Sequence, residues 1–63
     1  MINQNILRQR VRRFLEELDI PITKFAKKNG FSREAYYKWQ REDLTFSDEK
    51  AEKIDSYLKM YGF

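Results

Sequence analysis

The chain has 63 residues and a formal net charge of +3, and it contains neither cysteine nor histidine. Without these two residue types we expect no disulfide, no cysteine–histidine zinc site and no histidine-based catalytic dyad. A chain of this length buries only about 60% of the surface that its unfolded form exposes, so we expect one small domain over residues 1–63.

No apolar run is long enough to predict a membrane-spanning helix. Residues 1–8 lack the charged, apolar and small-residue order of a secretory signal. A cytoplasmic location is therefore expected.

Charge is distributed unevenly along the chain. Residues 1–41 contain ten basic and four acidic side chains, whereas residues 42–63 contain three basic and six acidic ones. Such an asymmetry indicates a polyanionic partner, although an ordinary solvated charge pattern also accounts for it.

Apolar residues recur at helical spacing near the start of the chain, and no alternating run of strand length is present. The first predicted helix covers residues 3–18 and ends before Pro21, because proline disfavours a helical residue before it. Polar residues, Arg8 among them, are expected on its solvent side. Its predicted apolar stripe consists of Leu7, Val11, Phe14, Leu15 and Leu18.

The second predicted helix is short and covers residues 22–28, with Phe25 and Ala26 facing inward. Asn29 and Gly30 follow it, and both residue types tolerate the left-handed conformation that ends a helix.

Two serines predict the start of the remaining helices. Ser32 is the expected N-cap of a helix over residues 33–41, with Glu34 in its first turn, and Ser47 is the expected N-cap of a helix over residues 48–60. The last helix has an apolar side formed by Ala51, Ile54, Leu58 and Tyr61. The predicted fold class is therefore all-α, a compact bundle of four short helices.

Two short helices joined by a tight turn with glycine are typical of a helix-turn-helix, here over residues 22–41. Ala26 permits close packing of the two helices, and Gly30 is free to adopt a positive φ. On a helical wheel, the apolar side of the helix predicted over residues 33–41 contains Ala35, Tyr36 and Trp39. The opposite, polar side contains Arg33, Glu34, Tyr37, Lys38 and Arg41. A polar side of this kind suits base edges in a major groove, but it is also typical of any surface helix.

The stretch from Ile22 to Arg41 resembles the helix-turn-helix of the Cro/CI-type (XRE-like) repressors of bacteriophages and bacteria. The resemblance rests on Phe25-Ala26, Gly30-Phe31-Ser32, Tyr36 and Trp39. The predicted helices before and after also match that family's layout, so the resemblance covers nearly the whole chain. It implies a lambda-repressor-like all-α domain in the cytoplasm of a bacterial cell, with the third helix in the major groove of DNA.

Three features depart from the family pattern. Asn29 stands where an apolar residue is usual, which predicts a looser end of the second helix. Leu15 and Gln40 stand where some members have an arginine–glutamate pair, so that bridge is expected to be missing. Residues 42–45 lack the glycine and proline common in that loop.

Carried over residue by residue, the resemblance implies base contacts from Ser32, Arg33, Glu34 and Tyr37. Arg33 is the first candidate, because a guanidinium can bind guanine O6 and N7 through two hydrogen bonds. Phosphate contacts, which fix register without reading sequence, are expected from Thr23, Lys24, Lys38 and Arg41.

The predicted function is a sequence-specific regulator of transcription, of repressor type, that binds double-stranded DNA as its operator. The main alternative is a helix-turn-helix-fold module that binds another protein, such as an antirepressor or inhibitor; single-stranded RNA binding is a lesser one. We expect no enzyme, cofactor, metal, small-molecule substrate or membrane, since no nucleophile has an evident base and no glycine-rich phosphate loop is present. A homodimer on DNA and dimerisation through a further C-terminal domain both stay open.

Overall fold

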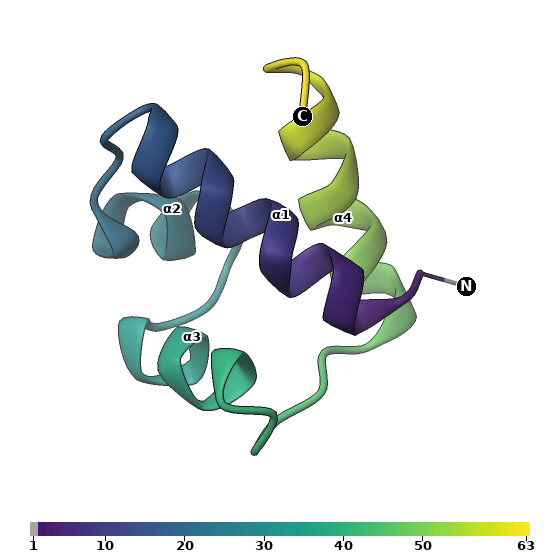
Figure 1. The fold of residues 1–63 in the computed structure, drawn as a ribbon. Coiled ribbons are helices and arrows are strands. Elements are labelled where there is room, and N and C mark those ends of the chain that lie inside the picture. The colour runs from purple at the N-terminus through teal and green to yellow at the C-terminus, as the bar shows by residue number, and fades with distance from the viewer. Residues whose placement is uncertain (1) are drawn as a thin grey trace.

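The computed structural model describes residues 2–63, which form four helices and, within that range, no strand. The predicted all-α bundle is confirmed, and every predicted helix boundary lies within one residue of the observed one. The helices are α1 (Gln4–Glu17), α2 (Ile22–Lys28), α3 (Arg33–Gln40) and α4 (Asp48–Lys59) (Figure 1). Among residues 2–63, no helix combines the length and apolarity needed to cross a membrane.

The helices pack as two pairs, α1 with α4 and α2 with α3. Figure 1 shows α1 running across the front of the molecule, with α3 below it and the C-terminus above it. The helix α3 therefore lies at the side of the molecule opposite the C-terminal end of α4.

An aromatic cluster around Phe14 joins the two pairs. The Phe14 ring is fully buried and lies 6.1 Å from the ring of Phe25 on α2, measured between centroids. At the C-terminal end it lies 5.3–5.8 Å from the rings of Tyr57, Tyr61 and Phe63. These three aromatic residues therefore cap the core of their own chain.

Two residues of the predicted apolar stripes are more exposed than expected. Leu18 is 43% exposed and Tyr61 is 50% exposed. The reason is the same for both: α1 ends at Glu17 and α4 ends at Lys59, so both residues lie beyond the end of their helix and do not continue its apolar stripe.

Each helix is followed, two or three residues beyond its last residue, by a residue with left-handed backbone conformation. These residues are Asp19, Gly30, Glu42 and Gly62, with φ values of 53°, 80°, 66° and 83°. The next amide in each case donates to a carbonyl five residues earlier, as Phe31 N does to Ala26 O at 3.0 Å and Asp43 N to Lys38 O at 2.9 Å. This is the Schellman arrangement, and it sets the direction of the chain as it leaves each helix.

The predicted loose end of α2 is wrong. Asn29 is buried, and its side-chain Nδ2 donates to the carbonyl of Phe25 at 3.0 Å. Its backbone N–H donates to the carbonyls of Phe25 and Ala26. Because the amide side chain satisfies itself on the preceding turn, a polar residue is accommodated where the family usually has an apolar one.

Candidate nucleic-acid interface

The start of α3 is defined by its N-cap. Ser32 has an extended backbone, and its Oγ accepts a hydrogen bond from the N–H of Ala35 at 3.0 Å. Glu34 lies in the first turn, where the helix dipole favours a carboxylate. The predicted cap is confirmed. The Ser32 oxygen accepts one hydrogen bond from the helix, which leaves its hydroxyl proton free to donate to an external acceptor and one lone pair free to accept.

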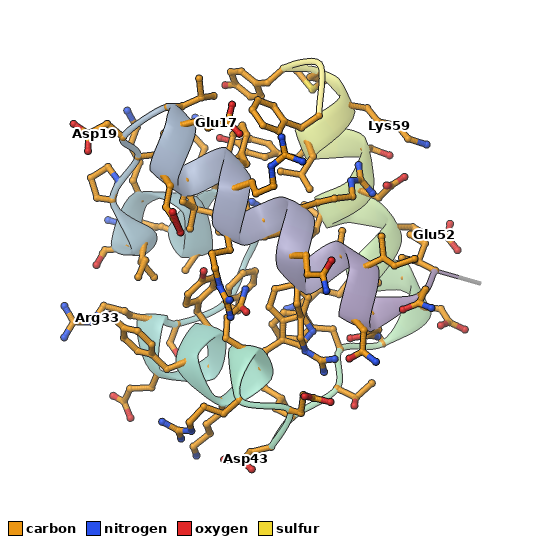
Figure 2. All side chains as sticks on the ribbon, viewed as in Figure 1. Glu17, Asp19, Arg33, Asp43, Glu52 and Lys59 are labelled. Atoms are coloured by element: carbon orange, nitrogen blue, oxygen red, sulfur yellow. The ribbon has the colours of Figure 1, made fainter. Side chains whose placement is uncertain are left out.

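The two sides of α3 are divided as the helical wheel predicts. Tyr36 and Trp39 are buried in the core, and Ala35 is half-buried. The other side is exposed, and Figure 2 shows Arg33 pointing away from the helix. The exposed residues are Arg33, Glu34, Tyr37, Lys38 and Arg41, and we call this set the outer face of α3.

Arg33 and Tyr37 lie together on the outer face. The guanidinium carbon of Arg33 is 6.0 Å from the centroid of the Tyr37 ring, within the range of a cation–π contact. The Tyr37 ring is 43% exposed and lies edge-on, 5.7 Å between centroids, to the buried ring of Tyr36. The core thus supports Tyr37, and Tyr37 in turn lies beneath the charge of Arg33.

The other end of the outer face is held less firmly. Arg41 Nε lies 3.2 Å from Asp43 Oδ2, and both side chains are more than 60% exposed. Exposed pairs of this kind contribute about 1 kcal/mol or less. Arg41 can therefore exchange this partner for a phosphate at small cost.

The phosphate candidates of α2 lie apart from the outer face. Thr23 and Lys24 are exposed in the first turn of α2, the helix that packs against α3. All eight sequence-predicted site residues are exposed, and six of them lie on α3 or next to its ends, whereas Thr23 and Lys24 lie on α2. Ser32 is also engaged as the cap of α3.

Positive charge is concentrated in the helix-turn-helix. Residues 22–41 contain six basic and one acidic side chain. Within residues 2–63, five of those six cations form no salt bridge: Lys24, Lys27, Lys28, Arg33 and Lys38. These lysines and arginines present charge that the fold itself does not neutralise.

Burial also affects one titratable group behind the outer face. Desolvation raises the pKa of the Tyr36 phenol above its ordinary value, so it stays neutral at physiological pH. Its oxygen accepts a hydrogen bond from Gln40 Nε2 at 3.3 Å. Tyr36 therefore serves the core and not the interface.

Sequence reasoning missed Arg8, which was expected on the solvent side of α1. Its side chain is buried and bonds to α3 and the loop that follows. Arg8 lies beside the apolar stripe of α1, and helical periodicity alone does not predict that a charged residue at this position is buried.

In residues 2–63 no cluster of three potential metal-ligating side chains occurs.

Comparison with known proteins gives no family assignment. No family model, no curated protein and no solved structure matches the chain.

Proposed function

We propose that this protein binds double-stranded DNA through α3 and regulates transcription as a Cro/CI-type repressor does. The observation that carries the proposal is the outer face of α3, which no other part of residues 2–63 covers. It presents guanidinium, ammonium, carboxylate and phenol groups on one side of a short helix. These are the groups that recognise base edges in a major groove.

The charge distribution supports the same proposal. A duplex carries one negative charge per about 1.7 Å of its axis, and cations that neutralise phosphates gain affinity by releasing counterions. Lys24, Lys38 and Arg33 have no carboxylate partner within residues 2–63, so no internal ion pair has to break before they bind phosphate.

Distinct roles follow from position. Arg33, supported by the Tyr37 ring, is assigned to guanine, and Tyr37 to a thymine methyl or a phosphate. Glu34 lies in the first turn, where it interacts with the helix dipole, and cytosine N4 is assigned to it as a second role. Thr23, Lys24, Lys38 and Arg41 are assigned to backbone phosphates.

Selection from random duplexes, followed by a salt titration on the enriched sequence, tests the proposal. We expect one sequence to be enriched, and log affinity to fall with log salt by about 0.9 for each phosphate neutralised. Lys38→Ala should weaken binding to all duplexes similarly and reduce that slope by about 1. Lys53→Ala is the matched control, since Lys53 is an exposed lysine on α4 and outside the helix-turn-helix. Enrichment of no sequence would contradict the proposal.

One observation favours the alternative, a module that binds another protein. A shallow cleft beside α3 has an apolar part formed by Leu15, Ile20, Ile22, Tyr36 and Tyr37, and polar residues complete its lining: Arg12, Glu16, Asp19 and Gln40. Binding there would change little with salt, because apolar contact releases no counterions. The salt titration therefore separates the two functions.

A further inference from the structure

Arg8 is a buried cation on α1 that forms no salt bridge within residues 2–63. Arg8 is only 8% exposed. All three nitrogens of its guanidinium group donate hydrogen bonds. Nε donates to the carbonyl of Trp39, Nη1 to Asn5 Oδ1 at 2.8 Å, and Nη2 to the carbonyl of Leu44 at 3.2 Å. Burying a charge costs free energy unless the charged group is hydrogen-bonded. The three hydrogen bonds therefore hold the Arg8 guanidinium at this position.

The groups that Arg8 binds belong to one region, the end of α3 and the loop that follows it. Trp39 contributes one of the last carbonyls of α3, where the helix dipole is negative and favours a cation. Leu44 lies in the middle of the loop between α3 and α4. The guanidinium carbon also lies 5.4 Å from the centroid of the Trp39 ring. Arg8 therefore links α1 to both the helix end and the loop.

Gln4 reinforces this link from one turn earlier on α1. Its Nε2 donates to the carbonyl of Phe46 at 2.6 Å, and its Oε1 accepts from the N–H of Phe46 at 3.2 Å. The same oxygen accepts from Trp39 Nε1 at 2.8 Å. A single amide side chain thus binds both backbone groups of one loop residue and the indole of α3.

Gln40 completes the connection from the side of α3. Its Nε2 donates to the carbonyl of Arg8 at 3.0 Å, and its Oε1 accepts from Arg12 Nη2 at 3.2 Å. The arginine–glutamate bridge of some family members is absent because Leu15 and Gln40 stand at its two positions, and Gln40 bonds instead to the backbone of Arg8 and the side chain of Arg12. The C-terminal half of α3 is therefore joined to α1 by polar contacts in addition to the buried apolar ones.

We propose that Arg8 is a positioning residue for DNA reading, because it fixes the direction of α3 and so the place at which Arg33 and Tyr37 meet the base edges. The inference rests on the proposed function. Hydrogen bonds to bases weaken steeply when distance or angle changes, whereas a phosphate attracts a cation over a longer range. A small rotation of α3 should therefore reduce specific binding much more than binding to random sequence.

The test compares Arg8→Lys and Arg8→Met with Val11→Ala. Lysine keeps the charge but lacks the fork of donors, and methionine keeps only the apolar stem. Val11 is fully buried one turn further along α1 and its side chain has no hydrogen-bonding group, so Val11→Ala destabilises the core without removing a hydrogen bond to α3 or to the loop. Two quantities are measured below the unfolding transition of every variant: the ratio of affinities for the selected and random duplexes, and the hydrogen exchange of the Asp43 and Phe46 amides.

We expect both Arg8 variants to lower the affinity ratio about tenfold or more, with affinity for random DNA nearly unchanged. The Asp43 and Phe46 amides should exchange faster in both Arg8 variants than in Val11→Ala, whose affinity ratio should match that of the unmodified chain. An unchanged ratio in both Arg8 variants would overturn the inference and leave the proposed function standing. If the unmodified chain itself fails to distinguish the two duplexes, the proposed function fails and the inference fails with it, even where the exchange rates respond.

Discussion

The two helix pairs use their charges differently. In the pair α1–α4, Asp55 bonds to Arg10 and lies 3.0 Å from Lys59, and Arg13 lies 3.3 Å from Glu17. In the pair α2–α3 no side chain forms an ion pair within the helices themselves, and Arg41, just beyond α3, pairs with Asp43 of the loop.

This difference distinguishes charged side chains that form ion pairs within the protein from cations that are left without such a partner. The Arg10–Asp55 pair is largely shielded, and Arg10 Nε also donates to the carbonyl of Phe63 at 3.0 Å, which ties α1 to the C-terminal end. Within residues 2–63, no ion pair holds Lys24, Arg33 or Lys38. The net charge of the chain therefore says little about partners, whereas the positions of the cations without a carboxylate partner say more.

The largest expected effect comes from removing the ring that joins the two pairs. Phe14→Ala should lower the free energy of unfolding by about 3–5 kcal/mol, because the fully buried ring contacts aromatic residues of α2 and of the C-terminal end. Urea denaturation followed by circular dichroism measures it. Tyr37→Ala, which removes an exposed ring, should change the midpoint far less. A folded Phe14→Ala with an unchanged midpoint would show that the pairs are stable separately.

Substitution on the outer face should affect binding without affecting the fold. Arg33→Ala is expected to cost about 1–3 kcal/mol at one base position of the selected duplex, since it removes a bidentate contact. Its thermal unfolding should match that of the unmodified chain, because Arg33 is exposed and has no salt bridge within residues 2–63. Binding to a panel of single-base variants measures the effect. Equal losses on selected and random duplexes would remove Arg33 from base reading.

Backbone strain provides a smaller test that applies to both pairs. Glu42→Gly, at the end of α3, should stabilise the protein by up to about 1 kcal/mol, because its left-handed φ costs an L-residue about 1–2 kcal/mol and glycine loses part of that gain in unfolded-state entropy. Asp19→Gly at the end of α1 should act similarly. Gly30→Ala, with a φ of 80°, is the opposite control and should destabilise. Thermal melts of the three variants give the comparison, and a destabilised Glu42→Gly would contradict it.

The ion pairs of α1–α4 predict a modest dependence of stability on acid pH. The hydrogen bond from Arg10 holds the pKa of the Asp55 carboxyl below its ordinary value. A lowered folded-state pKa stabilises the protein above the unfolded-state value of about 3.9, and this stabilisation is lost as the pH falls through the folded-state pKa. The stability difference between the unmodified chain and Asp55→Asn should therefore be constant near neutral pH and shrink below about pH 4.

Urea unfolding at a series of pH values measures that difference. Glu52→Gln is the control, because Glu52 is exposed on the same helix and has no salt bridge within residues 2–63. Parallel curves for the two variants would show that the Arg10–Asp55 pair adds nothing specific to the α1–α4 pair.

Much of the fold could be predicted from local signals. Ser32 and Ser47 cap α3 and α4 as expected, with Oγ atoms 3.0 and 3.2 Å from the amides that they accept from. Gly30 has the positive φ that the turn requires. Caps, turns and helical periodicity depend on neighbours within about one turn, so the sequence contains the whole cause.

The candidate site also has features that short-range sequence signals predict and features that depend on how the helices pack. The outer face of α3 could be predicted, because helical spacing alone separates Arg33 and Tyr37 from Tyr36 and Trp39. Whether those cations had carboxylate partners could not be predicted, since that depends on which helices pack together. The left-handed Asp19 and Glu42 were missed for a related reason, because both residues are strained there and persist only where the surrounding packing requires the chain to turn.

By itself the amino-acid sequence determined where the four helices begin and end and which side of α3 is polar, because these properties follow from short-range periodicity and capping. Only the tertiary structure decided that Arg8 and Gln4 hold the end of α3, through bonds to residues 31 to 42 positions away. Such contacts exist only after distant segments have met, and a buried arginine is tolerated there because the converging carbonyls satisfy its donors.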